Sequence, residues 1–427
     1  MLDIKLVRKN PDEIRANLEK RKHAPYVEMF DELVKYDKKY RELLLELENL
    51  RAEHNKVSRE VSVFKKAGKE KEAQVAMKRA KEIPERVKTA EVEMEEAKTK
   101  TEMLLKRTPN ILHESVPYGK DDTQNIVVKT WGKPSKVATP GHEEILHSLD
   151  GVDLERAAKI SGARFYFLKN QFVLLDLAIQ RMALEKLYEK GFTLMEVPHM
   201  MKREPYEGVT DLGDFEQVMY KIEGEDLYLI ATSEHPTMAS HMNEIIEPEN
   251  LPLKYAGISP CYRKEVGAHG KDTKGIFRVH QFNKIEQVII CKPEESWKLH
   301  EELLTNTEEM FQLLEIPYRV VNICTGDIGT VASKKYDIEA WMPATQDYRE
   351  VASCSNCTDY QANRLKIRTR VKKGSEEKQA VHSLNNTMVA TSRAIVSLIQ
   401  NHLQKDGSIK IPKALQKYTG FTEIKTK

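Results

Sequence analysis

The sequence has few cysteines, no long apolar run and almost no net charge. Its five cysteines are an odd number scattered over 427 residues, which argues against a disulfide framework and favours reduced thiols. No run of about 18 apolar residues occurs, and the opening residues, MLDIKLVRKNPDEI, lack the apolar core of a signal peptide. We therefore expect a soluble, cytoplasmic protein that has no membrane partner.

The balance of charge does not by itself point to a partner. The chain has 68 basic and 66 acidic residues, a net charge of +2, so only local clusters can indicate binding to nucleic acid. Neither an internal repeat nor a GxGxxG motif is present. A chain of this length suits two or three domains, one of which can bury a sizeable core.

The N-terminal part has the apolar spacing of two long helices. The first seam consists of Tyr26, Phe30, Leu33, Tyr40, Leu44, Leu47 and Val61. Four polar residues interrupt it: Asp37, Arg51, His54 and Ser58. After Gly68, which can end a helix, the spacing resumes at Val87, Ala90, Met94, Ala97, Thr101 and Leu104. The pattern predicts a long antiparallel coiled-coil hairpin whose arms protrude by about 40 to 60 Å.

Basic residues gather near the expected tip of this hairpin. They are Lys56, Arg59, Lys65, Lys66, Lys69, Lys71, Lys78 and Arg79, followed by Lys81, Arg86 and Lys88. Such a cluster can neutralise RNA phosphates, but acidic residues lie among them, so a solvated face is equally compatible. From periodicity alone a scaffold or dimerisation coiled coil is favoured, because coiled coils most often bind protein. The charge pattern leaves these readings open.

A linker follows the hairpin. The segment RTPNILHESVPYG, around Pro109 and Pro117, interrupts the helical periodicity, so we expect domains at 1–110 and 111–427. In the second domain, helical candidates at 171–190, 293–314 and 391–403 alternate with short strand-like runs such as DLYLIAT, YRVVNI and EQVIICK. Strands with flanking helices, without a regular βαβ repeat, predict an α+β domain around a largely antiparallel sheet.

One long segment carries unusual polar residues on strand-like stretches. In CYRKEVGAHGKDTKGIFRVHQFNKIEQ, we expect a hairpin with Arg263 and Glu265 on its first strand and a mobile connection rich in glycine and lysine. The even-numbered residues of the second strand share one face; they are Arg278, His280, Phe282, Lys284 and Glu286. This face suits a ligand with phosphates, a base and an amine. A surface ribbon with exposed salt bridges is the commoner alternative.

This segment resembles the second signature motif of class II aminoacyl-tRNA synthetases, specifically the seryl-tRNA synthetase family. The first motif of that class would end at Pro198 in GFTLMEVPHM, and LNNTMVATSRAIVSLIQNH resembles the third, with Arg393 at its expected place. SGARFYFLKN, ATSEHP and REVASCSNCTDYQANR match further family segments. The similarity covers nearly the whole chain. Each motif alone is weak, but these motifs in the right order, with the helical arm in front, are specific.

The resemblance implies an α+β class II catalytic domain, built on a mostly antiparallel sheet with flanking helices, that uses ATP and Mg²⁺. Three residues would be catalytic: Arg263, Arg393 and Glu286. The ATP-binding residues would be Arg263, Lys264, Glu265, Arg278, Val279, Phe282, Glu350, Val351, Ala352, Ser353 and Arg393.

The implied roles follow the chemistry of each side chain. Arg263 would contact the α-phosphate and the substrate carboxylate, and Arg278 and Arg393 would hold the outer phosphates. Glu265, Phe282 and the Val279 backbone would hold adenine. Glu350 and Ser353 would supply oxygen ligands to Mg²⁺.

Serine would be bound by Thr232, Ser233, Glu234, Arg263, Glu286, Asn385 and Thr387. Thr387 would receive the serine hydroxyl, although the split of amino and hydroxyl contacts among Glu234, Glu286 and Thr387 stays open. The implied activity is serine:tRNA ligation through seryl-adenylate. The basic arm would grip the long variable arm of serine tRNA, and charging of selenocysteine tRNA is left open. A homodimer with Pro198 near its interface is implied.

Two other functions and a zinc site are the alternatives. An amino-acid:carrier-protein ligase and a non-catalytic coiled-coil protein derived from a synthetase are less compatible with the long arm and the retained charged residues. The CxxC formed by Cys354 and Cys357 lacks a second pair at zinc-finger spacing. The apolar stripe of helix 171–190 is expected to pack on the sheet. The sequence departs from the common family pattern at Asn386, where glycine is frequent, which concerns fine specificity more than the reaction.

Overall fold

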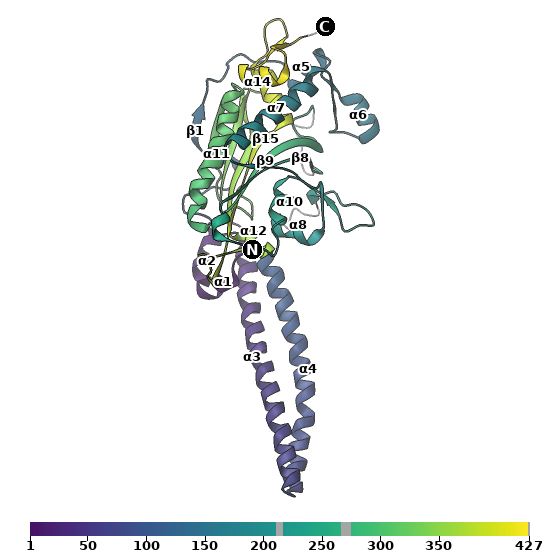
Figure 1. Ribbon diagram of the computed structural model, residues 1–427, viewed down its shortest axis with the longest axis vertical. Coiled ribbons are helices and arrows are strands. Elements are labelled where there is room, and N and C mark those ends of the chain that lie inside the picture. Colours follow the sequence, from purple (N-terminus) through teal and green to yellow (C-terminus); the bar gives the residue numbers. More distant parts are fainter. Residues whose placement is uncertain (211–216, 266–274, 426–427) are drawn as a thin grey trace. The chain divides into compact units, whose positions relative to one another are not determined.

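The structure is a computed structural model that describes residues 1–210, 217–265 and 275–425 (Figure 1). The connection predicted to be mobile within the hairpin, 266–274, lies outside the described residues. The chain divides into two compact units. One comprises Leu2–Glu19 and His23–Thr108, and the other comprises Met1, Lys20–Lys22 and Pro109–Lys427.

The helical unit is a long antiparallel hairpin preceded by two short helices. Its helices are α1 (Ile4–Lys9), α2 (Pro11–Glu19), α3 (Ala24–Lys66) and α4 (Glu70–Arg107), and Figure 1 shows α3 and α4 side by side. The turn between them contains Gly68 at φ +68°, a conformation that glycine adopts without the steric cost of a side chain. The predicted coiled-coil hairpin is confirmed, although α4 begins well before Val87 and runs through Pro84.

The seam of this hairpin differs in detail from the predicted one. On α3 the buried residues are Phe30, Leu33, Asp37, Leu43, Leu47, Leu50 and Val57. Leu43 occupies the place predicted for Leu44, which is 36% exposed. Asp37, predicted to interrupt the seam, lies inside it because Arg8 and Arg41 both donate hydrogen bonds to its carboxylate. Two guanidinium partners satisfy a carboxylate that burial alone would destabilise.

The second unit, Met1, Lys20–Lys22 and Pro109–Lys427, is built on an eight-stranded sheet with the strand order β1-β10-β11-β12-β15-β9-β8-β4. Every pairing is antiparallel except that of β4 with β8, so the predicted α+β class and mostly antiparallel sheet are confirmed. In sheet order the strands are β1 (Ile126–Trp131), β10 (Tyr318–Asn322), β11 (Lys334–Met342), β12 (Asp347–Thr358), β15 (His382–Ala390), β9 (Gln281–Cys291), β8 (Leu253–Tyr262) and β4 (Thr193–Glu196).

Smaller elements complete this unit. The helices are α5 (His142–Ser148), α6 (Leu154–Ser161), α7 (Gln171–Glu189), α8 (Arg203–Val209), α10 (Glu234–Ala239), α11 (Ser296–Leu313), α12 (Tyr360–Leu365), α13 (Thr391–Asn401) and α14 (Lys413–Thr419). The small sheets pair β14 (Lys378–Ala380) with β13 (Arg368–Arg370) and β7 (Ile245–Ile246), β16 (Ile409–Lys410) with β17 (Glu423–Ile424), β2 (Val152–Asp153) with β3 (Phe167–Leu168), and β5 (Met200–Met201) with β6 (Tyr228–Leu229).

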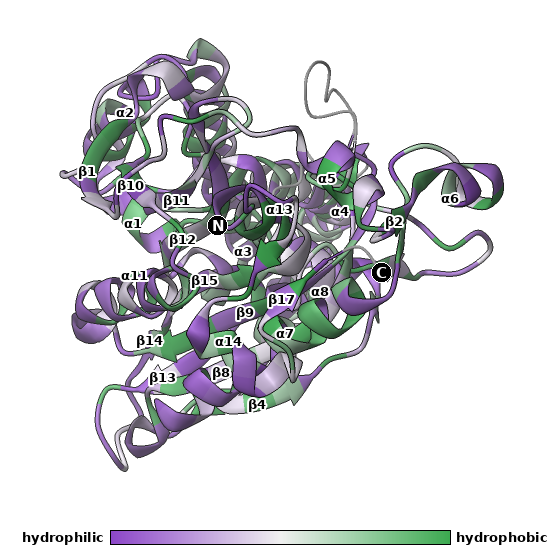
Figure 2. Ribbon diagram, turned by 90° about the horizontal axis from the view of Figure 1, so that it is seen from above, coloured by the Kyte–Doolittle hydropathy of each residue, from purple (hydrophilic) through white to green (hydrophobic). Residues whose placement is uncertain are grey.

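Side chains on β9 alternate between two hydrophobic clusters. Ile285 and Ile289 pack in the main core with α7, α11 and α13, whereas Val288 and Ile290 pack with α8, α10 and α12. Because alternate residues of a strand face opposite sides of a sheet, these two groups of helices cover opposite faces. Figure 1 shows α11 running along the strands and α8 beside α10, and the hydropathy colours of Figure 2 mark the many apolar residues of α7.

The predicted helices at 171–190, 293–314 and 391–403 are present, with ends shifted by a few residues. On α7 the expected packing against the sheet holds for Leu175, Ile179 and Met182, which are buried. It is wrong for Leu174 and Leu177, which are 49% and 55% exposed. The run DLYLIAT forms only the two-residue strand β6. No helix in the described part of the chain is both long and apolar enough to cross a membrane.

Candidate active site

A cavity of about 530 Å³ opens on the face of the sheet that carries α10 and α12. Most of the predicted site residues line it: Thr232, Glu234, Arg263, Glu265, Phe282, Glu286, Glu350, Val351, Ala352, Ser353, Asn385, Thr387 and Arg393. Four of the residues predicted to bind ATP or serine are not part of its lining: Ser233, Lys264, Arg278 and Val279.

Strand pairing explains how distant segments meet in this cavity. On β9, Phe282, Lys284 and Glu286 share the face that looks into it. On the neighbouring strand β15, Thr387 lies directly opposite Glu286. Sequence reasoning found the alternation on β9, but the partner strand lies about a hundred residues away in the chain.

The predicted hairpin strands are shorter than expected. β8 ends at Tyr262 and β9 begins at Gln281, so the placement of Arg263, Glu265 and Arg278 on strands is wrong. Glu265 has a positive φ of +48°, a conformation that does not continue a strand. Arg278 Nη1 lies 3.6 Å from Glu265 Oε2. The argument that even-numbered side chains share a face therefore applies only from Phe282 onwards.

The other three residues outside the lining contact neighbouring protein groups. Ser233 Oγ donates to the Gly257 carbonyl oxygen at 3.0 Å. A Cβ at Gly257 would lie 2.7 Å from Ser233 Oγ, so this close approach requires glycine. Val279 is buried in the main core. The Lys264 backbone N–H donates to the Val218 carbonyl at 2.9 Å, and its ammonium lies 6.0 Å from the Tyr220 ring centroid.

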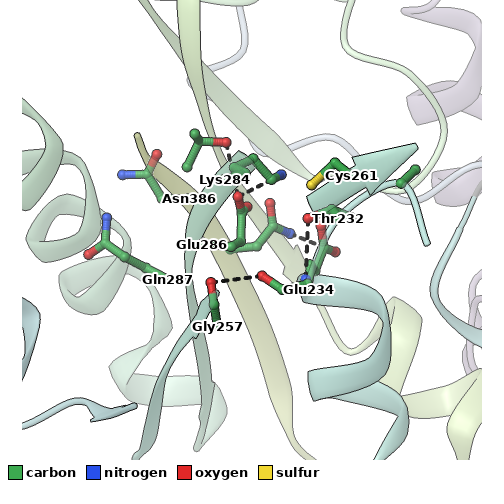
Figure 3. Close-up of polar contacts among 12 residues, drawn as sticks. Thr232, Glu234, Gly257, Cys261, Lys284, Glu286, Gln287 and Asn386 are labelled. Atoms are coloured by element: carbon green, nitrogen blue, oxygen red, sulfur yellow. Dashed lines mark hydrogen bonds and ion pairs between the residues drawn. The ribbon is translucent and has the colours of Figure 1, made fainter. Parts of the chain in front are cut away.

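One end of the cavity holds a cluster of fixed polar groups, drawn in Figure 3. The Thr387 hydroxyl donates to Glu286 Oε2 at 3.0 Å, and Lys284 Nζ lies 2.7 Å from the same oxygen. The side chains of Lys284 and Glu286 are 6% and 2% exposed. A buried ion pair of this kind is stable only because each charge has its partner. Lys284 was predicted to share this face but not assigned a role.

Glu234 lies beside this cluster and is oriented by two amides. Gln361 Nε2 and Asn385 Nδ2 donate to Glu234 Oε1 at 2.8 Å and 3.0 Å. Burial, and secondarily the charge of Glu286, raise the pKa of Glu234 to about 7. The carboxyl can therefore exchange its proton near neutral pH. Sequence reasoning missed Gln361, which lies in REVASCSNCTDYQANR, because no local pattern links it to Glu234.

A second group of residues that line the cavity is rich in charge. Arg393 Nη1 donates to the Glu350 carbonyl at 3.0 Å and lies 3.5 Å from Glu350 Oε2. Partial burial raises the pKa of Glu350, but Arg393, Lys335 and Arg263 lower it by more, so this pKa lies below its usual value. The Arg263 guanidinium carbon lies 5.4 Å from the Phe282 ring centroid. Cations, a carboxylate and an aromatic ring thus line one space.

Oxygen donors for a hard metal ion lie on two adjacent strands. Ser353 of β12 is paired with Asp337 of β11, and Asp337 Oδ1 is buried without a hydrogen-bond partner among the described residues. Burial raises the pKa of Asp337 to about 7, with Glu350 adding to the effect and Lys335 opposing it. These oxygens fit Mg²⁺, which prefers carboxylate and hydroxyl ligands, and Asp337 extends the predicted pair of Glu350 and Ser353.

The two cysteines of the CxxC contact different neighbours. Asn385 Nδ2 lies 3.7 Å from Cys357 Sγ, and Cys354 Sγ lies 3.7 Å from the His300 carbonyl oxygen. The described residues contain no group of three or more histidine, cysteine or acidic side chains arranged to hold a metal.

The mostly antiparallel sheet, with an arginine-rich, carboxylate-lined cavity on one face, is the arrangement that the resemblance to class II aminoacyl-tRNA synthetases implies. A family model described as the tRNA synthetase class II core domain (G, H, P, S and T) matches residues 217–402. A second, the seryl-tRNA synthetase N-terminal domain, matches residues 1–112. A serine–tRNA ligase from Methanocella arvoryzae is 54% identical over 425 residues, covering 99% of this chain and 100% of the relative. The chain belongs to the seryl-tRNA synthetase family.

Two solved structures agree with this family. A crystal structure of seryl-tRNA synthetase from Pyrococcus horikoshii complexed with ATP is 49% identical and covers 100% of both chains, with a TM-score of 0.95. A cytoplasmic serine–tRNA ligase from Naegleria fowleri in complex with AMP is 36% identical, covers 100% of this chain and 99% of its own, and has a TM-score of 0.88. The predicted family is confirmed, and these relatives do not support the two alternatives.

Proposed function

We propose that this chain activates L-serine with ATP and transfers the seryl group to the 3′ end of serine tRNA. The observation that carries the proposal is the Thr387–Glu286 contact beside Arg263 and Arg393 in one cavity. Full-length identity of 54% to a serine–tRNA ligase supports it. Because charged tRNA is used in protein synthesis, we place the activity in the cytoplasm.

The first step needs charge neutralisation and alignment more than proton transfer. The serine carboxylate is ionised at neutral pH, so its oxygen attacks the α-phosphorus directly, the bond to the bridging oxygen breaks, and pyrophosphate leaves. Arg263 stabilises the charge that develops at the α-phosphate, and Arg393 binds the outer phosphates. Phe282 presents its ring to adenine, and Glu265 accepts from the adenine amino group.

The second step transfers the seryl group. The terminal ribose hydroxyl of the tRNA attacks the carbonyl carbon of seryl-adenylate and gives its proton to a phosphate oxygen of the adenylate, and AMP leaves with the electron pair of the cleaved carbon–oxygen bond. Arg263 remains positioned to hold the phosphate of the leaving AMP.

Serine is selected by hydrogen bonding. We assign the substrate ammonium to Glu234 and Thr232, and the hydroxyl to Glu286 and Thr387, with Asn385 orienting Glu234. If alanine entered, the buried polar groups that serve the hydroxyl would lose their partner, which allows strong rejection without an editing step. Threonine must be refused by the size of the pocket.

Mg²⁺ fits the oxygen donors Glu350, Ser353 and Asp337, because one oxygen of the buried Asp337 carboxylate has no partner among the described residues. When bound, the ion would neutralise phosphate charge and orient the leaving group. Lys335 lies 3.4 Å from Asp337 Oδ2 and balances the local excess of carboxylates.

The helical arm is proposed to bind the long variable arm of serine tRNA. Its tip residues are all exposed: Lys56, Arg59, Lys65, Lys66, Lys69, Lys71, Lys78 and Arg79. Double-stranded RNA is bound through its shape, phosphates and 2′-hydroxyls, so exposed cations suffice without base-specific contacts. Selenocysteine tRNA, where it is present, is a further candidate substrate for the same arm.

A homodimer is supported by exposed apolar residues at the edge of the sheet. Leu174 and Leu177 are half-exposed on α7, and Leu194 is 41% exposed on β4, the terminal strand of the sheet order. Exposed apolar side chains on a helix and on an edge strand suit a second protein chain. Pro198 follows this strand and would lie near the interface.

Pyrophosphate exchange distinguishes this function from the alternatives. We expect serine-dependent ATP/pyrophosphate exchange, followed by charging of serine tRNA. Exchange without tRNA charging would indicate a carrier-protein ligase, and neither activity would indicate a non-catalytic protein. Either outcome would overturn the proposal.

A further inference from the structure

Four buried polar side chains lie on the far side of the strands from the cavity. Gln287, Thr307 and Asn386 are fully buried, and Asn306 is 1% exposed. Two come from strands β9 and β15 and two from helix α11. Figure 3 shows Gln287 and Asn386 on the opposite side of the strands from Glu286 and Lys284. We call these four residues the rear network.

The rear network lies directly behind the proposed serine contacts. Asn386 is paired with Gln287 across β15 and β9, and the adjacent pair is Thr387 with Glu286. Because side chains alternate along a strand, one pair faces the cavity and the next pair faces α11. Any shift in the rear pair must therefore move the pair that faces the cavity.

The hydroxyl of Thr307 is the centre of the network. It accepts hydrogen bonds from Gln287 Nε2 at 3.1 Å and from Asn386 Nδ2 at 2.9 Å. It donates to the carbonyl oxygen of Thr387 at 2.9 Å. A hydroxyl has one donor and two acceptor positions, and all of them are used here. A helix side chain thereby holds the backbone of a cavity residue from behind.

The hydrogen bond from Thr307 to the Thr387 carbonyl lies where the pairing of β15 with β9 becomes irregular. The register of β15 on β9 shifts between Thr387 and Val389, so the regular ladder does not by itself determine the backbone there. The amides of Gln287 and Asn386 also donate to the Leu303 carbonyl of α11. The helix thus holds both strands at the level of the cavity-facing pair.

Stability of the fold does not explain why these four buried side chains are polar. Asn306 Oδ1 and Asn386 Oδ1 are buried and make no hydrogen bond within the described residues, and apolar side chains of similar shape would serve a core equally well. A hydrogen-bonded network instead specifies one geometry, because its bonds have preferred lengths and directions.

We propose that Thr307, acting with Gln287 and Asn386, is a positioning residue that sets the Thr387–Glu286 pair and thereby the discrimination of serine from threonine. This inference rests on the proposed function of the cavity. Thr307 contacts no substrate itself. It acts through the Thr387 backbone, so its loss changes amino-acid selection and leaves the nucleotide end of the cavity as it is.

The test is ATP/pyrophosphate exchange with the full chain. Thr307→Val keeps the shape of the side chain and removes all three hydrogen bonds. We expect KM for serine to rise about 10-fold, KM for ATP to stay unchanged, and the ratio of threonine to serine activation to increase. Thr307→Ser should restore all three parameters, because it keeps the hydroxyl. Thr305→Val is the matched control, since Thr305 is an exposed residue of α11 whose hydroxyl bonds only to its own helix.

Three outcomes would count against the positioning role of Thr307. Unchanged serine KM and selectivity in Thr307→Val, or equal changes for serine and ATP, would overturn the positioning role. If that variant does not fold, Asn386→Ala, which removes one of the two amides that donate to the Thr307 hydroxyl, is measured in its place, and unchanged serine KM and selectivity in Asn386→Ala would overturn the positioning role. An unmodified chain that exchanges no pyrophosphate with serine would instead overturn the proposed function, and this inference with it.

Discussion

The hydroxyl of Thr387 donates a 3.0 Å hydrogen bond to Glu286 Oε2 across two adjacent strands. The same oxygen lies 2.7 Å from Lys284 Nζ. Two partners thus fix the carboxylate without any contribution from substrate, and such preorganisation avoids a reorganisation cost when a ligand binds.

The first prediction concerns the charge of Glu286. Glu286→Gln removes the carboxylate that pairs with the buried Lys284 ammonium, at a cost of about 3 kcal/mol. We expect kcat/KM for serine in pyrophosphate exchange to fall about 100-fold. Glu302→Gln is the matched control, because Glu302 pairs with Lys254 at 2.6 Å in a more exposed place. Equal activity of the two variants would contradict the assigned role.

Serine affinity should depend on pH through Glu234. Burial and the charge of Glu286 raise its pKa to about 7, so the carboxyl is mostly protonated below that pH and ionised above it. Only the ionised form attracts the substrate ammonium. KM for serine should therefore fall about 10-fold as the pH rises from about 6 to about 8. Glu234→Gln should make KM independent of pH over this range, and a pH-dependent KM in that variant would disprove the explanation.

The stability of the helical unit should depend on Asp37. Its side chain is 3% exposed and pairs with Arg8 and Arg41. Asp37→Asn removes the charge that both guanidinium groups share, and should lower the free energy of unfolding by about 1 to 2 kcal/mol. Asp31→Asn breaks the more exposed pair with Arg15 and should cost less than about 0.5 kcal/mol. Denaturant unfolding followed by far-UV circular dichroism measures both, and equal costs would contradict the argument.

Neutralising the tip of the helical arm should separate tRNA binding from serine activation. In a variant with Lys65, Lys66, Lys69 and Lys71 changed to glutamine, we expect KM for serine tRNA to rise more than about 10-fold at moderate salt, with a weaker salt dependence, because phosphate contacts are lost. Pyrophosphate exchange should be unchanged. Glutamine at Lys405, Lys410 and Lys413 provides a control with similar loss of charge. Identical tRNA affinities in the two variants would exclude the tip as the contact.

Local patterns predicted much of this protein. The coiled-coil hairpin follows from apolar spacing and from Gly68, and the spacing of a helix is a local property. Phe282, Lys284 and Glu286 were placed on one face because strand alternation is local too. Both predictions concern residues within a few positions of each other.

Predictions failed where geometry depends on distant segments. β9 begins at Gln281, and not before Arg278, because its partner strand β8 ends at Tyr262, the residue paired with Gln281. Leu43 replaces Leu44 in the coiled-coil seam because the partner helix selects the face. Gln361, which orients Glu234, is more than a hundred residues from it in the chain.

The sequence by itself determined the long helices and the face that Phe282, Lys284 and Glu286 share, because backbone sterics and apolar periodicity act over a few residues. Only the tertiary structure decided that Thr387 meets Glu286, that Asp337 joins Ser353, and that Thr307 holds the Thr387 backbone from behind. These contacts arise from sheet order and register. Both are settled by packing of the whole core, and no local stretch of sequence records them.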